Sequence, residues 1–380
     1  MMYSKTTHTD ISQYKTTSSR RWLLALAFAA VLIALIPDIV AKDVSILGKR
    51  PPIFNIVFAF RTLMAALSSW LIVRALASPA VVSAAAPMGQ TEDLLTFAPR
   101  IKDRIVWAVL LLSSLFVAIF LALPKTFTNL STEDSVIETL SALLWFSSSG
   151  VFLWIFVLLR RSAGRTKPIL AVASLSLALV FFVMGGEEIS WFQRILSISS
   201  PAAFQANQQK ELNLHNFYTD RSEIAFDLFS FLFLIILPFT RSLRANKDNP
   251  EQRGSLAFFI PGSFVLFASA ICMAYNYDRW NIIFEQLKFF ITLFILLHSI
   301  KLSHSSGTRA LLSCVVAVYI LTQVLFLAFG GRTGRIWDVT EYFEFLVAVS
   351  FFIFSIEMMY KARSLLETTA VRPNAVETTA

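Results

Sequence analysis

Long apolar runs are the feature that most constrains the fold of this chain. Each run holds about 20 residues, the length at which an α-helix crosses the hydrocarbon core of a bilayer. The sequence therefore predicts an all-α, polytopic transmembrane helical bundle of about ten helices. The runs cover residues 22–40, 53–77, 105–124, 136–160, 168–185, 223–240, 255–275, 279–301, 309–330 and 339–360.

The composition excludes a soluble globular domain. Hydrophobic residues make up 56% of the chain and charged residues 15%, with a mean hydropathy of +0.64. These values lie outside the range of soluble domains and match polytopic membrane proteins. The two cysteines, Cys272 and Cys314, both lie within apolar runs, so the sequence predicts no disulfide framework.

The net charge of +8 would suggest nucleic acid binding in a soluble protein, but in this chain it follows membrane topology. Ten spans that start inside put both termini in the cytoplasm, and the inside segments then hold the excess of Lys and Arg. The inside loops 160–168 and 241–253 carry this signal most clearly. We predict no nucleic-acid partner, contact with the lipid bilayer, and location in a bacterial inner (plasma) membrane.

The runs and the polar stretches between them predict five segments. A helix pair precedes a Pro- and Ala-rich linker, and an eight-helix body follows it. The predicted segments are a cytoplasmic tail (1–20), an N-terminal helix pair (21–77), a cytoplasmic linker (78–104), a transmembrane body (105–361) and a disordered tail (362–380).

A polar island at residues 185–216, on the outer side of the body, is the candidate site. Ionisable residues at membrane level are costly and therefore indicate a structural or functional role. If the chain continues as a helix after residue 185, Glu187, Trp191 and Arg194 share one face. Glu187 would then pair with Arg194, leaving Glu188 for general acid or base chemistry. The alternative is a helix end with a surface salt bridge and an interfacial Trp.

The second half of this island is rich in amides and holds a histidine. On a helix, Gln208, Glu211 and His215 share a face, and the Glu-x-x-x-His spacing can present two ligands to one metal. A divalent metal is therefore a candidate cofactor, with Glu188, Glu211 and His215 as candidate ligands. His215 could instead act in acid–base chemistry, bind substrate or brace the loop.

The amides of the island suit the recognition of hydroxyl or phosphate oxygens, although amides also satisfy loop backbone. These candidate substrate contacts are Asn207, Gln208, Asn213 and Asn216.

Charged residues also lie inside the apolar runs. Glu138, Asp227, Glu285 and Glu344 lie one to two turns into their runs, too deep for helix capping. Lys288 is three residues from Glu285, which predicts a simple ion pair. Arg61 has no local acid, so we expect it to meet Glu138, Glu188 or another carboxylate across helices, or to face a cavity that holds an anionic substrate.

The island and the start of the fourth run carry a resemblance. The stretches EDSVIE (133–138), GEEISWFQR (186–194) and NQQKELNLHN (207–216) resemble a family of uncharacterised bacterial multi-pass membrane proteins with a GEEISWxQR … NxQxExNLHN motif. The resemblance covers roughly residues 133–216. It implies no known reaction, so it supports the location of the site and not a mechanism.

Together these patterns predict an enzyme at the outer membrane–water boundary. It would act on a lipid or lipid-linked substrate by acid–base or metal-assisted hydrolysis or group transfer. Glu188 would be the base or a metal ligand, His215 its partner, and Glu211 the residue that orients His215. Arg194 and Arg61 would stabilise charge, and Glu138 would add a carboxylate. The alternatives are a proton-coupled transporter and a membrane scaffold or assembly factor.

Overall fold

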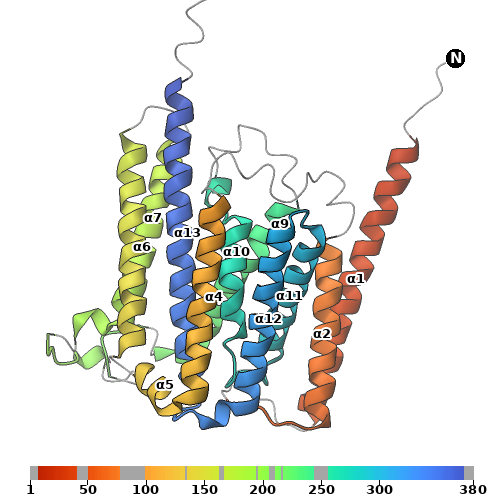
Figure 1. Ribbon diagram of the computed structural model, residues 1–380, viewed down its shortest axis with the longest axis horizontal. Coiled ribbons are helices and arrows are strands. Elements are labelled where there is room, and N and C mark those ends of the chain that lie inside the picture. The colour runs from red at the N-terminus through yellow and green to blue at the C-terminus, as the bar shows by residue number, and fades with distance from the viewer. Residues whose placement is uncertain are drawn as a thin grey trace, which may run out of the picture.

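The structure is a computed structural model that describes residues 7–40, 50–77, 99–132, 135–161, 167–193, 196–204, 210–214, 217–243 and 256–371. Ten segments among these residues are long and apolar enough to cross a membrane, which confirms the predicted all-α polytopic bundle. Figure 1 shows that α1 begins and α13 ends at the same end of the bundle. The opposite end, where α7 finishes, is called the motif end below.

The bundle contains both long helices and short helical pieces. The long helices are α1 (Thr7–Val40), α2 (Ile56–Leu76), α4 (Pro99–Ala122), α6 (Val136–Arg160), α7 (Lys167–Glu188), α11 (Ile283–Leu302), α12 (Ser306–Phe329) and α13 (Asp338–Val371). The shorter pieces are α5 (Pro124–Leu130), η1 (Ser190–Phe192), α8 (Thr219–Phe231), η4 (Leu232–Ile236), α9 (Leu237–Ser242), η7 (Leu256–Phe259), α10 (Ser263–Ser269) and η8 (Ala270–Ala274).

Helix pairs flank a buried centre. α6 packs on α7 and α13 at one flank, and α2 packs on α1 and α11 at the other (Figure 1). Buried residues make up 72% of the apolar window in the membrane span of α13, but only 17% in the membrane span of α1. α13 is therefore an interior helix, whereas α1 lies at the periphery.

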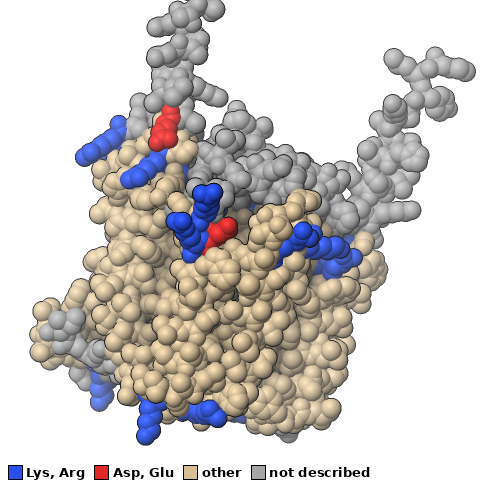
Figure 2. Space-filling view, viewed as in Figure 1, with Lys and Arg blue, Asp and Glu red and all other residues tan. Residues whose placement is uncertain are grey.

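The charged surface agrees with a membrane-spanning bundle. Figure 2 shows that, on the visible face, the Lys, Arg, Asp and Glu of the described residues lie near the two ends of the molecule. The broad belt between them is formed by other residues. Such a belt matches the hydrocarbon core of a bilayer, because charged side chains are expensive there.

The seventh apolar run departs from its prediction as one continuous helix. η7, α10 and η8 follow one another in this run, and the helix breaks at Pro261–Gly262. The Gly262 N–H donates to both carboxylate oxygens of Glu357, at 3.1 and 3.0 Å. Lys361 Nζ lies 2.8 Å from Glu357 Oε1 and donates to the Ile260 carbonyl at 3.0 Å. Side chains of α13 thus form hydrogen bonds with the N–H and C=O groups of the broken backbone, which lipid could not do.

Three helices extend into segments that the sequence assigned elsewhere. α1 begins at Thr7 within the predicted tail, α4 begins at Pro99 within the predicted linker, and α13 continues to Val371 within the predicted C-terminal tail. Apolar length measures only the part of a helix that crosses hydrocarbon, and polar helix formers continue it into water. Residues 78–98 of the linker and 372–380 of the tail lie outside the described residues.

The Glu357 contact predicts a large loss of stability on truncation. In Glu357→Ala, the Gly262 N–H and the Lys361 ammonium lose a buried partner, and we expect a cost of about 3–5 kcal/mol. Thermal unfolding in detergent measures it. Glu367→Ala, at an exposed position of the same helix, is the control and should unfold like the wild type. Equal unfolding of the two variants would contradict this role of Glu357.

The charge distribution predicts which end faces the cytoplasm. A green fluorescent protein fused after residue 380 should fluoresce, and alkaline phosphatase inserted in the loop 196–204 should be active. With the two reporters exchanged, alkaline phosphatase at the C-terminus should be inactive and green fluorescent protein in the loop should not fluoresce. The opposite pattern would place the motif end in the cytoplasm.

Candidate functional site

The chain turns sharply where α7 ends at Glu188. Ser190, Trp191 and Phe192 follow with φ of 46°, 53° and 63°. Left-handed backbone is rare for residues with a side chain, and three in succession require support from their surroundings. The predicted helical continuation after Glu188 is therefore wrong for residues 190–192, and Glu187 and Trp191 do not share a helix face. Arg194 itself lies outside the described residues.

The left-handed turn still returns Trp191 to Glu187. The Trp191 indole N–H donates to Glu187 Oε1 at 2.9 Å, and the Leu214 backbone N–H donates to Glu187 Oε2 at 2.6 Å. Gly186 makes the close approach possible, since a Cβ there would lie 2.9 Å from Trp191 ring atoms. Glu187 thus ties the end of α7, the turn and the segment 210–214 together, which makes it a positioning residue.

The second half of the motif folds back onto the turn. The Ser190 hydroxyl donates to Glu211 Oε2 at 2.5 Å. Asn213 Nδ2 donates to the same oxygen at 3.0 Å and to Ser190 Oγ at 3.2 Å. All three side chains are buried. Residues 210–214 are not helical, so the predicted helical face of Gln208, Glu211 and His215 is not formed there.

Glu188 faces a different set of partners from Glu187. Its Oε1 accepts a hydrogen bond from Trp145 Nε1 on α6 at 3.3 Å. Its charge interacts with those of Glu138 on α6 and Glu344 on α13, and Glu341 on α13 interacts with all three. These four glutamates, each half-buried, come from three helices. They are called the carboxylate cluster below.

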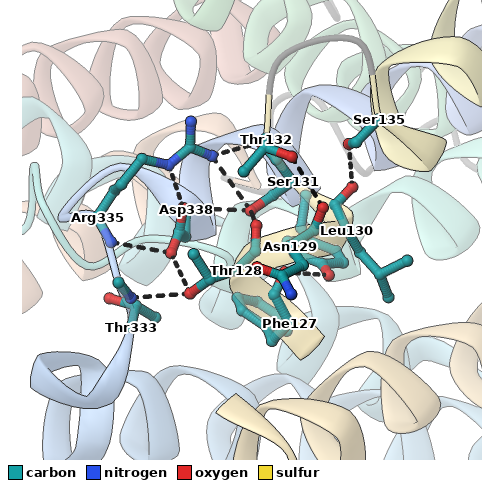
Figure 3. A network of polar contacts seen from close by, with 12 residues as sticks. Phe127, Thr128, Asn129, Leu130, Ser131, Thr132, Ser135, Thr333, Arg335 and Asp338 are labelled. Carbon is teal, nitrogen blue, oxygen red and sulfur yellow. Dashed lines mark hydrogen bonds and ion pairs between the residues drawn. The ribbon is translucent and has the colours of Figure 1, made fainter. Parts of the chain in front are cut away.

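A polar network at the start of α13 sets the position of two of these glutamates (Figure 3). Asp338 accepts hydrogen bonds from Thr128 Oγ1 at 2.6 Å and from Ser131 Oγ at 3.2 Å. Arg335 Nε lies 2.8 Å from Asp338 Oδ1, and Arg335 Nη2 donates to the Ser131 carbonyl at 2.5 Å. The network fastens the N-terminus of α13 to α5, so Glu341 follows one turn later and Glu344 about two.

The carboxylate cluster is suited to proton transfer. Neighbouring carboxyl groups that interact electrostatically can serve as acid and base in one reaction. The Trp145 indole orients Glu188 within this group. Among the residues that the structure describes, no three or more His, Cys, Asp or Glu side chains are arranged to hold a metal ion. The candidate metal ligands Glu188 and Glu211 have separate partners, and His215 lies outside the described residues.

The remaining predicted site residues divide between two places. Arg61 Nη2 donates to Asn281 Oδ1 at 3.3 Å, on the flank of the bundle away from α6 and α7 (Figure 1). The structure therefore does not bring Arg61 to the motif. The predicted contacts that lie outside the described residues are Arg194, Asn207, Gln208, His215 and Asn216.

Sequence reasoning missed three members of this site. Glu341 was not among the predicted site residues, and Glu344 was noted only as a charge inside the last apolar run, although their position in that run was a usable signal. Trp145 carried no signal, because its buried position depends on how α6 and α7 pack.

Comparison with known proteins finds no matching family model, no matching curated protein and no matching solved structure. The site is therefore interpreted from its own geometry, and the resemblance to a bacterial membrane-protein family stays a prediction.

The contact between Gly186 and Trp191 predicts a coupled pair of substitutions. Gly186→Ala should destabilise the protein by about 1–3 kcal/mol, because the new methyl group displaces the indole. In a Trp191→Ala background the same change should be neutral or stabilising by up to about 1 kcal/mol, since Ala favours the helix. Unfolding of the two single variants and the double variant in detergent measures this coupling.

Gly150→Ala is the matched control, because a Cβ at Gly150 would meet nothing within 4 Å. It should be neutral or stabilising in both backgrounds. An equal cost of Gly186→Ala with and without the Trp191 ring would contradict the packing described above.

Proposed function

We propose that this integral membrane protein is an enzyme that acts on a lipid or lipid-linked substrate at the outer face of a bacterial inner membrane. The reaction class is acid–base hydrolysis or group transfer. The observation that carries the proposal is the carboxylate cluster, in which glutamates of α6, α7 and α13 come together around Glu188.

The cluster supplies both partners of an acid–base reaction. An ionised Glu188, oriented by Trp145, would take the proton of an attacking water or hydroxyl group. A protonated neighbour, from Glu138, Glu341 or Glu344, would give a proton to the leaving oxygen. General acid and base groups placed in this way contribute about 10²–10⁴-fold each.

The position of the cluster supports a lipid-linked substrate. All four glutamates fall within the membrane-spanning segments, in the last turn of the α7 span and the first turns of the α6 and α13 spans. A substrate must therefore reach them at the depth of the bilayer surface. Molecules anchored in the bilayer are delivered to that depth.

Glu187 and Glu211 take supporting roles in this proposal, since their oxygens bind the motif itself. Trp191 and Asn213 hold the same fold. The proposed contacts to substrate are Arg194, Asn207, Gln208, His215 and Asn216. A divalent metal held with the help of His215 would give a metal-assisted form of the reaction, and mass spectrometry of the purified protein measures the metal content.

A proton-coupled transporter is the second candidate function. It is favoured by ionisable side chains buried inside the bundle, where Lys288 lies 2.9 Å from Asp227 and 2.8 Å from Glu285. Uptake or export assays in vesicles, with and without a proton gradient, separate transport from catalysis. A scaffold or assembly factor predicts instead that site variants change the stability of a partner protein and leave lipid chemistry unchanged.

Replacing Glu188 tests the proposed enzyme. A host strain without this protein is complemented with the wild type or with Glu188→Gln, and its lipids and surface glycans are compared by mass spectrometry. We expect the wild type to restore the profile and Glu188→Gln to fail, because the amide cannot accept the proton. The loss of turnover should be about 10²–10⁴-fold.

Glu367→Gln is the matched control, since it makes the same chemical change on α13 roughly 35 Å further along the helix than Glu344. It should restore the profile fully. Restoration by Glu188→Gln at the wild-type level would rule out Glu188 as the catalytic base.

A further inference from the structure

A second charged group lies buried between α8, α11 and the segment that joins η8 to α11. Lys288 Nζ lies 2.9 Å from Asp227 Oδ2 and 2.8 Å from Glu285 Oε2. Arg279 pairs with Glu223 and, at 3.4 Å, with the same oxygen of Asp227. Each cation therefore contacts one oxygen of each of two neighbouring carboxylates.

The opposite oxygens of this group point to a missing positive partner. Within the described part of the chain, Asp227 Oδ1, Glu285 Oε1 and Asn276 Oδ1 are buried and have no hydrogen-bond partner. Their residues are 3%, 3% and 6% exposed. Asn276 cannot be turned to help, because its Nδ2 already donates to Glu285 Oε2 at 2.7 Å. All three are acceptors, and leaving a buried acceptor unsatisfied is costly.

The same three residues line one cavity. Thr340 and Phe343 of α13 close it on another side, and the Thr340 hydroxyl is held by Asp278 at 2.8 Å. The space open to the centre of a water-sized sphere is ≈ 10 Å³, which is room for about one water molecule or an ion of that size.

The charges of the group favour an ion over a neutral molecule. Asp227 and Glu285 carry two negative charges around the one ammonium group of Lys288, and Arg279 is shared with Glu223. The unsatisfied oxygens therefore lie in a locally negative, low-dielectric environment, where an uncompensated charge costs several kcal/mol. One bound monovalent cation balances this excess.

Irregular backbone surrounds this cavity. The apolar span that contains α10 ends in the 3₁₀ turn η8, and the chain then continues without a helix to residue 282. The π-helical segment η4 begins one turn after Asp227. Non-helical backbone at membrane depth is tolerated where it lines a polar cavity, and π-segments occur often at functional sites. Broken helices also form the cation sites of many membrane proteins.

We propose that this cavity binds one monovalent cation of sodium size, with Asp227 Oδ1, Glu285 Oε1 and Asn276 Oδ1 as its side-chain ligands. Oxygen-only ligands select a hard cation. Among the described residues, no three or more His, Cys, Asp or Glu side chains are arranged to hold a metal ion. The carboxylates of Asp227 and Glu285 share the one positive charge of Lys288, so one further positive charge balances them. The site is separate from the carboxylate cluster and does not depend on the proposed enzyme activity.

Sodium binding to the wild-type chain in detergent tests the proposal directly. Equilibrium binding of ²²Na⁺ and thermal unfolding are measured in NaCl and in choline chloride at equal ionic strength. We expect saturable binding of one Na⁺ per chain and a melting temperature that rises with NaCl only. Absence of saturable binding, with the same melting temperature in both salts, would mean that the cavity holds water and would overturn the proposal.

Asn276→Ala identifies the ligands without changing a charge. It should weaken ²²Na⁺ binding at least about tenfold and abolish the difference between the two salts. Glu367→Gln, at an exposed position near the far end of α13, is the control and should bind Na⁺ like the wild type. Wild-type affinity in Asn276→Ala would overturn the assigned site. Should Asn276→Ala fail to fold, the wild-type comparison of the two salts still decides the proposal.

Discussion

The absence of water inside a bilayer is the constraint on which this structure depends. Every polar group at membrane depth must find its partner within the protein. The chain meets this requirement by concentrating its polar contacts on α13. Asp338 holds Thr128, Ser131 and Arg335 at one end of this helix, and Glu357 holds a broken backbone at the other. α13, one of the two most buried spans of the described chain, thus supplies polar partners near both of its ends.

The two acidic regions show how differently buried carboxylates can be used. In the buried group, each acid lies within ion-pair distance of Lys288 or Arg279, or accepts a hydrogen bond from a neighbouring hydroxyl or amide group. In the carboxylate cluster, by contrast, the charges of four glutamates interact with one another, and Glu188 accepts a hydrogen bond from a neutral indole. Paired charges favour a fixed structure, whereas mutually repelling acids favour exchange of protons.

The sequence predicted the fold well because the length of an apolar run is a local property. It did not predict the break in the seventh run, since the partner of Gly262 lies 95 residues further along the chain. Glu187 and Trp191 were expected to share a helix face, with Glu187 paired to Arg194; instead Trp191 meets Glu187 through a left-handed turn. Glu188 and Glu138 of the carboxylate cluster were among the predicted site residues, whereas Glu341 and Glu344 were not, because they join the cluster only when α13 packs with α6 and α7.

Thr340 and Glu341 are adjacent on α13, and they belong to different sites. Consecutive residues of a helix point about 100° apart, so Thr340 closes the buried cavity while Glu341 joins the carboxylate cluster. The same turn of α13 therefore contributes side chains to both sites. A rotation of α13 that enlarges one of these sites would also reshape the other, because both are built on the same turn of the helix.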